Sequence, residues 1–168
     1  MIKLNRHNII GGKKMKKLDK TNVYLKEFQE SDLEEFYRIA KNKEVKQFVK
    51  LFYPNTFEDT KKILELAKKD YIVFKIVDER DSITGAIAGR KTGNKIIDVS
   101  YFIGPRYRGK GYCSKAVKLF KAYLKKTSNY KVMRFLIASN NYSSQHVMNR
   151  VGISYKYTRM YRVYECKI

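Results

Sequence analysis

The spacing of apolar and polar residues changes along the chain, and these changes predict its elements. Residues 22–28 (NVYLKEF) alternate between apolar and polar, which is typical of a half-buried strand. Residues 30–42 and 56–70 repeat apolar residues every three or four positions, which predicts two amphipathic helices. A shorter helix is expected over residues 43–51.

The two longer helices carry start signals. Ser31 and Glu34 have the spacing of a capping box, and Thr56 is a suitable N-cap. The apolar residues expected to face the core are Leu33, Phe36, Ile39 and Ala40 in the first helix and Ile63, Leu66 and Ala67 in the second.

Beyond residue 70 the sequence becomes dense in β-branched and aromatic residues. Residues 71–79, 83–91 and 95–104 are separated by the turn sequences DERDS and TGN, so they predict a three-stranded antiparallel meander. Residues 131–139 predict a buried strand, and the last 16 residues predict two more strands.

Two helices are expected in the second half. One follows Gly111, and a short one ends at Gly152, a suitable C-cap residue. The apolar face of the longer helix consists of Ala116, Val117, Phe120, Tyr123 and Leu124. The order β–α–α–(α)–β–β–β–α–β–α–β–β predicts a mixed α/β (α+β) domain with an antiparallel first half and a crossover helix in the second.

The composition of the chain suits a single domain but leaves the origin of its high net charge to be explained. The chain has 168 residues, 43% of them hydrophobic, which suits one domain with one core. Its formal net charge of +21 favours an anionic partner such as RNA, a ribosome or a phosphorylated cofactor. A codon bias toward lysine, isoleucine, asparagine and tyrosine is the competing explanation for that charge.

The N-terminus predicts a basic, poorly ordered leader over residues 1–20, followed by one domain over residues 21–168. The leader has no apolar segment of the signal-peptide kind, and the order GGKKM leaves open a translation start at Met15. Cys113 and Cys166 fit no metal spacing and are expected to be reduced thiols in a cytoplasm. No segment is long and apolar enough to predict a membrane span.

The sequence RYRGKG, residues 106–111, lies where a predicted strand ends and a helix begins. A helix N-terminus offers unpaired N–H groups and a partial positive charge, and glycines let a ligand approach the backbone. Three basic side chains add charge. These features predict a pyrophosphate site of the pattern [R/Q]-x-x-G-x-[G/A]; the spacing fits neither a Walker A loop nor a Rossmann loop. A flexible basic turn is the alternative.

A second motif, NYSSQHVMNRVGI, begins at Asn141 and follows the buried strand. Asn141 and Ser144 open the short helix there, and ordinary N-capping would explain either of them alone. Together, RYRGKG and this motif resemble the GNAT acyl-CoA N-acetyltransferase superfamily. The register YFIGPRYRGKGYCSKAV is closest to the ribosomal-protein N-terminal (Rim-type) acetyltransferases and their antibiotic-modifying relatives.

The resemblance implies a mostly antiparallel central sheet of about six to seven strands flanked by helices. It also implies acetyl-CoA as the acetyl donor, no metal, and direct attack by a primary amine. Implied contacts with acetyl-CoA are Phe102, Ile103 and Gly104 for pantetheine, and the N–H groups of Arg108, Gly109, Lys110, Gly111 and Tyr112, with the Arg106 side chain nearby, for the diphosphate. Cys113, just after the loop, is also placed at the cofactor, and Asn141 and Ser144 are placed beside the pantetheine arm and the thiol.

The resemblance implies Asp98 as the general base. It implies Asn141 and Ser144 as a route for the proton that the leaving thiolate of CoA takes up. A solvent-facing strand residue is the alternative reading of Asp98, and Glu165 is a second candidate base. Tyr142 and Tyr155 are candidate proton donors, because Met148 stands where many relatives carry a tyrosine acid.

The expected activity is therefore acetyl transfer from acetyl-CoA to a protein N-terminus, a small amine or a tRNA-linked amino group, by a bacterial cytoplasmic monomer or homodimer. The positive charge favours a ribosomal or tRNA-linked acceptor over a cationic antibiotic and allows contact with RNA. The alternative is a non-catalytic RNA- or ribosome-binding module on the same fold.

Overall fold

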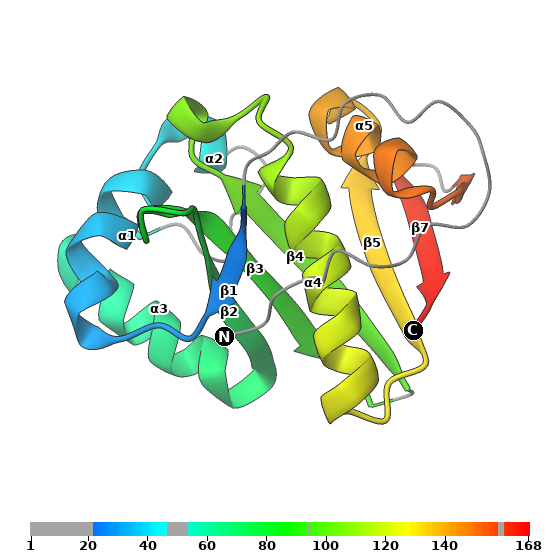
Figure 1. Cartoon of the computed structure of the whole chain (residues 1–168), viewed down its shortest axis with the longest axis horizontal. Coiled ribbons are helices and arrows are strands. Elements are labelled where there is room, and N and C mark those ends of the chain that lie inside the picture. The colour runs from blue at the N-terminus through cyan, green and yellow to red at the C-terminus, as the bar shows by residue number, and fades with distance from the viewer. Residues whose placement is uncertain (1–21, 47–53, 94, 158–159) are drawn as a thin grey trace.

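A seven-stranded sheet runs through the protein in the order β1-β2-β3-β4-β5-β7-β6 (Figure 1). The computed structural model describes residues 22–46, 54–93, 95–157 and 160–168. The strands are β1 (Tyr24–Lys26), β2 (Tyr71–Val77), β3 (Ile83–Lys91), β4 (Ile96–Ile103), β5 (Val132–Ala138), β6 (Tyr155–Tyr157) and β7 (Tyr161–Lys167). The helices are α1 (Leu33–Ala40), α2 (Lys43–Lys46), α3 (Phe57–Asp70), α4 (Tyr112–Thr127) and α5 (Tyr142–Val151), with 3-10 turns η1 (Glu30–Asp32) and η3 (Pro105–Tyr107).

Strand pairing is antiparallel except between β4 and β5, which are parallel. Parallel neighbours need a crossover, and α4 supplies it. The mixed, mostly antiparallel sheet flanked by helices was predicted, and the observed order of elements agrees with the predicted order.

Each face of the sheet carries its own core. Helices α4 and α5 cover one face, where Phe120 and Met148 pack with strand residues such as Phe135. Helices α1, α2 and α3 lie on the other face, where Phe36 packs with Phe102. Fully burying a side chain of this size contributes roughly 2 kcal/mol relative to exposure, so both layers stabilise the sheet.

Two details of the predicted helices are wrong. The first helical segment begins at Gln29, whose N–H donates to Asp32 Oδ2 (2.6 Å), and not with the predicted pair Ser31 and Glu34. In α3, Leu66 is 69% exposed, because the buried face follows Thr60, Leu64 and Ala67. The predicted cap Thr56 is confirmed, since its Oγ1 accepts from the N–H of Asp59 (3.2 Å).

Some predictions fall outside the described residues. These are the leader over residues 1–20 and the part of the expected helix over 43–51 that follows Lys46. Gly152 ends α5 in the left-handed region at φ +75°, as predicted. Within the described ranges, no helix has both the length and the apolar character that crossing a membrane requires.

Candidate functional site

Strands β4 and β5 pair over only three positions and then separate. The pairs are Ile96 with Val132, Ile97 with Met133 and Asp98 with Arg134. β4 continues to Ile103 and β5 to Ala138 without further pairing between them. Figure 1 shows the two strands diverging toward the end of the molecule where α5 lies, which leaves a gap with unpaired strand edges.

The direction of backbone hydrogen bonds alternates along β4, and this identifies the backbone groups that face the gap. The N–H of Gly104 donates to Thr84 on the β3 side (2.8 Å), and Lys95 O accepts from the N–H of Val132 on the β5 side (3.2 Å). Because bonding directions alternate along an antiparallel strand, the backbone groups of Tyr101 and Ile103 face the gap.

Of the three predicted pantetheine contacts, only Ile103 therefore presents its backbone to the gap. Phe102 faces β3 with its backbone, and its side chain packs in the core beneath α1. Both backbone groups of Gly104 are occupied, since its carbonyl also accepts from the N–H of Tyr107 (2.9 Å).

Tyr101 joins the two sides of the gap, a role that the sequence did not predict. Its ring packs edge-on against Phe135 of β5, with 6.2 Å between ring centroids. Its hydroxyl donates to the carbonyl of Ser144 in α5 (3.4 Å). Burial raises the pKa of Tyr101, so the hydroxyl stays protonated and acts as a donor.

The glycine loop between η3 and α4 adopts the conformation that its glycines permit. Gly109 and Gly111 both have φ +77°, in the left-handed region that residues with a Cβ avoid. Within the described part of the chain, the N–H groups of Gly109, Lys110 and Gly111 have no hydrogen-bond acceptor. A row of such N–H groups forms a concave binding site for an anion.

Helix α4 begins directly behind this loop. Gly111 is its N-cap residue, no side chain caps it, and its first turn contains no acidic residue. The first N–H groups of the helix, beginning with Tyr112 and Cys113, have no partner within the helix. The positive end of the helix dipole therefore adds to the loop, and this combination is chemically suited to a phosphate group.

The three basic side chains of the loop differ in what they contact. Arg108 forms an ion pair with Glu44 of α2, and its Nε donates to the carbonyl of Ile103 (3.3 Å), so this residue fixes the loop to its surroundings. Lys110 lies over the ring of Tyr107, 5.9 Å from its centroid. Arg106 is exposed. The N–H of Arg108 donates to Pro105 (3.3 Å), so it does not join the free N–H groups.

Asn141 and Ser144 form the N-terminal cap of α5. Asn141 Oδ1 accepts from the N–H of Ser144 (3.1 Å), as ordinary capping requires. Next to them, the buried amide of Gln145 donates to the carbonyls of Ala138 (3.3 Å) and Ser139 (2.9 Å) at the end of β5. These bonds hold α5 against β5 on one side of the gap.

Asp98 lies at the closed end of the gap. Its carboxylate accepts from Arg134 Nε (2.6 Å) and Nη2 (3.1 Å), and from Arg90 Nη2 (2.9 Å). Partial burial opposes ionisation, but the two arginines outweigh it and lower the pKa of Asp98 below its ordinary value. A carboxylate held in this way is a weak proton acceptor, so the geometry gives no support to Asp98 as the base.

Cys113 lies in the first turn of α4 and packs at the edge of the core. Both cysteines are free. Part of the Cys113 residue reaches the surface, yet burial of its thiol raises the pKa to about 12. The thiolate is thus scarce at neutral pH, which agrees with a structural role.

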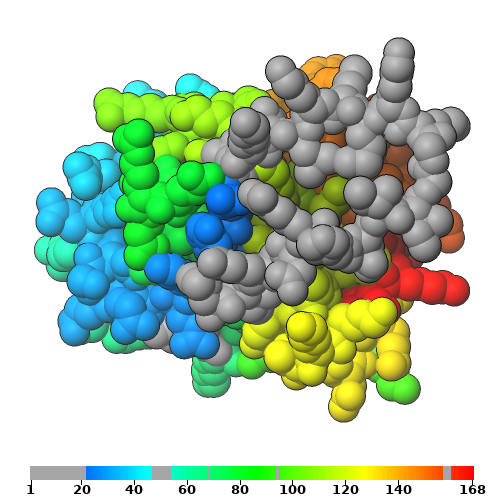
Figure 2. Space-filling view, viewed as in Figure 1, coloured from blue at the N-terminus to red at the C-terminus, as the bar shows by residue number. Residues whose placement is uncertain are grey.

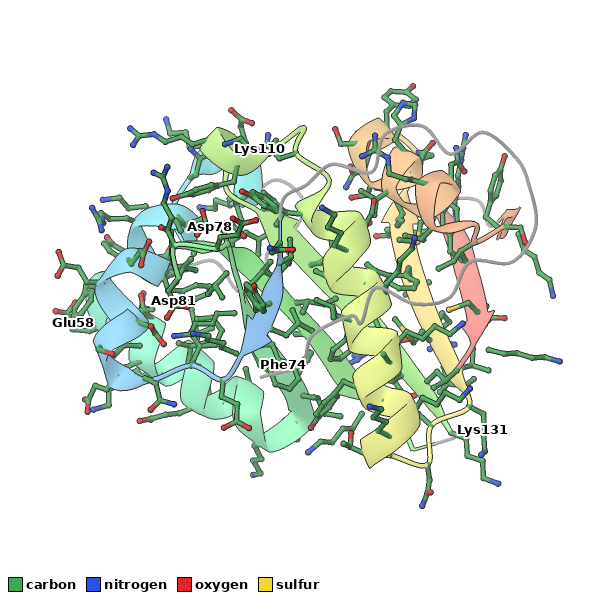
Figure 3. All side chains as sticks on the ribbon, in the orientation of Figure 1. Glu58, Phe74, Asp78, Asp81, Lys110 and Lys131 are labelled. Atoms are coloured by element: carbon green, nitrogen blue, oxygen red, sulfur yellow. The ribbon has the colours of Figure 1, made fainter. Side chains whose placement is uncertain are left out.

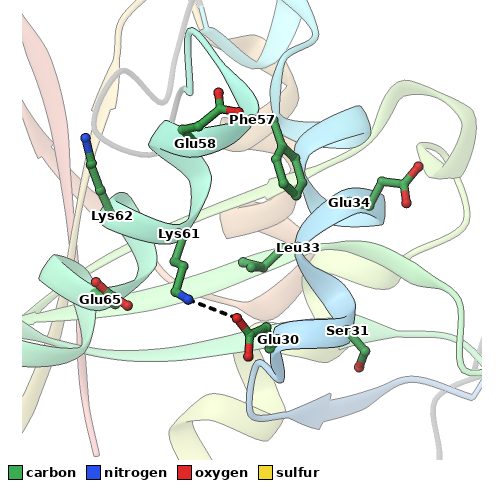
Figure 4. Close-up of a pocket in the computed structure, with 9 residues that line it drawn as sticks. All are labelled: Glu30, Ser31, Leu33, Glu34, Phe57, Glu58, Lys61, Lys62 and Glu65. Carbon is green, nitrogen blue, oxygen red and sulfur yellow. Dashed lines mark hydrogen bonds and ion pairs between the residues drawn. The ribbon is translucent and has the colours of Figure 1, made fainter.

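A separate hollow lies away from this site. It is a groove of about 700 Å³ between α1 and α3, lined by residues that include Phe57, Glu34 and Glu65, and the ion pair of Lys61 with Glu30 crosses it (Figure 4). No residue of the glycine loop or of the strand gap lines it.

Comparison with known proteins identifies the family. Residues 22–154 match the family described as the acetyltransferase (GNAT) domain. The chain belongs to the GNAT acetyltransferase family. Members transfer an acetyl group from acetyl-CoA to an amine, so this GNAT protein is an acetyl-CoA-dependent N-acetyltransferase whose acceptor amine the family does not define.

Solved structures of similar fold include several acetyltransferases. The ribosomal L7/L12 α-N-protein acetyltransferase RimL in complex with coenzyme A has a TM-score of 0.74 and 14% identity, over 90% of this chain and 96% of that chain. RimJ of Mycobacterium smegmatis has a TM-score of 0.74 and 11% identity, over 87% and 82%.

The spermidine N-acetyltransferase of Vibrio cholerae, solved with CoA and spermine, has a TM-score of 0.72 and 14% identity, over 87% of this chain and 94% of that chain. At these identities the likeness concerns the fold. No curated protein matches this chain by sequence. The family match confirms the predicted family, and the Rim-type subgroup stays a prediction.

Proposed function

We propose that the glycine loop and the strand gap together bind acetyl-CoA. The diphosphate would lie on the N–H groups of Gly109 to Cys113, at the positive end of α4, with Arg106 and Lys110 adding charge. The observation that supports this most strongly is the row of loop N–H groups without an acceptor in the described residues. Arg108 is assigned to bracing the loop through Glu44.

The pantetheine arm would extend along the open edge of β4. Its amides would pair with strand backbone. The N–H and C=O groups of Tyr101 and the N–H of Ile103 face the gap, while the Ile103 carbonyl already accepts from Arg108 Nε (3.3 Å). The thioester oxygen would accept a hydrogen bond from one of these N–H groups, which stabilises the negative charge that develops during attack. Asn141 and Ser144 would border the thiol end of the arm from α5.

The reaction consists of one direct transfer. The neutral amine attacks the thioester carbonyl, a C–N bond forms, and the C–S bond breaks. The sulfur leaves as the thiolate of CoA, which takes up one proton, and the amine loses one proton to a base or to water. Asp98 does not suit the base role, because both of its carboxylate oxygens accept from arginines.

For the acceptor we propose the amino terminus of a ribosomal protein, with a tRNA-linked amino group as the second candidate. The net charge of +21 favours an acceptor carried by an anionic particle and disfavours a cationic small amine. The structural neighbour RimL, a ribosomal L7/L12 α-N-protein acetyltransferase, supports the first choice. A bacterial cytoplasm is the proposed location, since it supplies acetyl-CoA and ribosomes and suits two free cysteines. A monomer or homodimer is the proposed state.

A thiol-release assay tests this function. Purified protein is mixed with acetyl-CoA and with panels of ribosomal N-terminal peptides, aminoacyl-tRNAs, polyamines and antibiotics, and free CoA is measured with a thiol reagent. Release is expected with a peptide that has a free α-amine and not with the same peptide already acetylated. Absence of any thermal stabilisation by millimolar acetyl-CoA would contradict the proposal, because a ligand that binds the folded state raises its apparent stability.

A further inference from the structure

The positive charge of the chain is confined to part of it. Residues 22–81 hold 12 basic and 13 acidic residues, so this region is almost neutral. Residues 82–168 hold 18 basic residues and only two acidic ones, Asp98 and Glu165. Among the described residues, the excess charge therefore lies in the half that contains α4, β5, α5 and β7.

A uniform codon bias does not produce this distribution. Lysine is no more abundant in the charged half, with 11 lysines in residues 82–168 against 10 in the shorter segment 22–81. The halves differ because acidic residues are nearly absent from the second one. A bias toward lysine codons would raise the lysine count in both halves and would not remove the acids from one of them.

The two acidic residues of this half do not neutralise its surface lysines. Asp98 binds Arg90 and Arg134. Glu165 is the register partner of Arg134 on β7 and raises the pKa of that guanidinium by its charge. Both acids thus interact with arginines in one row of side chains across β3, β4, β5 and β7. The positive charge of the lysines around that row is not neutralised by either acid.

Six lysines gather at the end of the molecule where α4 finishes. We call them the basic edge. They are Lys95, Lys121, Lys125, Lys126, Lys131 and Lys167. The end of α4 and the turn into β5, both yellow, form the lower border of the face shown in Figure 2.

Backbone contacts bring the lysines of the sheet together. The N–H of Lys131 donates to Lys95 O (2.7 Å), and the carbonyl of Lys131 accepts from Ile168 (2.9 Å). Lys167 is adjacent to them, since it pairs with Val132 across β5 and β7.

Lys125 and Lys126 lie in the last turn of α4, which ends at Thr127, four residues before Lys131. Lys121 is close enough to Cys166 to lower the pKa of that thiol by its charge, although burial raises it more. No ammonium group of the basic edge has an ion pair or hydrogen bond with another described residue.

The composition of this surface identifies its partner. Protein interfaces depend on buried aromatic or aliphatic anchors, and none of the large hydrophobic side chains exposed in the described regions lies among these lysines. Single-stranded nucleic acid stacks its bases on exposed aromatic rings, which the basic edge also lacks. The half-buried neighbours Tyr130 and Ile168 pack against the core. Free lysines without a fully exposed apolar anchor suit the phosphates of a duplex.

We propose that the basic edge binds the phosphate backbone of structured RNA. The choice of RNA over DNA rests on the proposed ribosomal acceptor. Figure 3 places Lys131 at the opposite end of the molecule from Lys110 of the glycine loop, so this site is separate from the acetyl-CoA site. α4 spans that separation, and its 16 residues correspond to about 24 Å.

Fluorescence anisotropy with a labelled RNA duplex of about 20 base pairs, titrated between about 50 and 200 mM salt, tests the site. The test variant combines Lys131→Gln with Lys167→Gln. The matched control combines Lys62→Gln with Lys69→Gln, which removes the same charge from exposed positions of α3 in the neutral half. The first pair should weaken binding about 10-fold and reduce the salt slope by about two, while the control leaves both nearly unchanged.

Four results would overturn this site. An equal loss of RNA affinity in both variants would mean that the RNA is attracted by the overall positive charge of the protein. The basic residues before position 22 contribute to that charge equally in both variants. Displacement of RNA by saturating acetyl-CoA would place the RNA on the glycine loop. Equally tight binding of polyglutamate, or tighter binding of a DNA duplex, would overturn RNA as the partner. Since none of these measurements requires turnover, they succeed or fail independently of the acetyltransferase assay.

Discussion

Asp98 of β4 and Arg134 of β5 are the last register partners through which the two strands meet, and their side chains also form a two-point ion pair with bonds of 2.6 and 3.1 Å. Beyond this pair the strands separate. The ion pair therefore stands at the closed end of the gap proposed for pantetheine, and we expect it to fix the angle between the strands.

Replacing Asp98 tests whether it positions the strands or acts as the base. Asp98→Asn leaves two arginines without their carboxylate, so the free energy of unfolding should fall by about 2 kcal/mol. The KM for acetyl-CoA should rise, and kcat should stay within about 10-fold of wild type, a smaller loss than removal of a general base gives. Glu165→Gln is a parallel test, since Glu165 is the register partner of Arg134 on β7 and the second candidate base, and a large loss of kcat there would assign the role to Glu165. A loss of kcat of about 10³-fold with an unchanged KM would instead identify Asp98 as the base.

The same residue predicts a dependence of stability on pH. The folded state lowers the pKa of Asp98 below its ordinary value of 3.8, so the ionised carboxylate stabilises the fold above that pH. This contribution is lost as the pH falls through the lowered pKa. Thermal unfolding should therefore show a constant difference between wild type and Asp98→Asn above about pH 5 and a shrinking difference below pH 3.8. A difference that does not change with acid would show that the carboxylate is not stabilised by folding.

Cys113 provides a test of direct transfer. Its thiol has a pKa of about 12, so a covalent acetyl-cysteine is not expected, although the residue borders the glycine loop. Cys113→Ala should retain kcat within about 3-fold, and mass spectrometry of wild type mixed with acetyl-CoA should show no acetylated cysteine. Loss of all activity in Cys113→Ala with acetyl-CoA binding intact would argue for an acetyl-enzyme.

Tyr164 carries a fully buried hydroxyl with no hydrogen-bond partner in the described structure. An unsatisfied buried hydroxyl is unfavourable, so Tyr164→Phe should raise the free energy of unfolding by about 1 kcal/mol. Tyr101→Phe is the matched comparison, because the Tyr101 hydroxyl does have an acceptor, Ser144 O. That variant should lose about 1 kcal/mol. Chemical denaturation measures both, and equal effects would mean that Tyr164 has a partner, such as a bound water.

Local features of this protein were predictable from its sequence. The glycines of RYRGKG predicted a loop of unusual backbone conformation at a strand–helix junction, and Gly109 and Gly111 adopt the positive φ there; its anion-binding role stays a prediction. The inward orientation of Tyr101 could also have been predicted, because strand alternation places it on the same face of β4 as Ile97, Val99 and Ile103. Each of these signals depends on neighbours in the chain.

Long-range pairs were not predictable in this way. Asp98 and Arg134 are 36 positions apart, and Glu44 and Arg108 are 64 apart. Their meeting depends on the register of β4 against β5 and on the packing of α2 near the loop. This explains why Asp98 was assigned to catalysis from its position alone, while the structure shows both of its oxygens bound to arginines.

The most direct test of the proposed site compares two glycines. Gly109 and Gly93 both have positive φ, +77° and +85°, and a Cβ at either would meet open space. Glutamate at each position therefore adds the same charge and similar backbone strain, but only Gly109→Glu places a carboxylate at the diphosphate site. Calorimetry with acetyl-CoA should show binding by wild type and Gly93→Glu, and none by Gly109→Glu. Equal affinity in the two variants would contradict the assignment of the glycine loop.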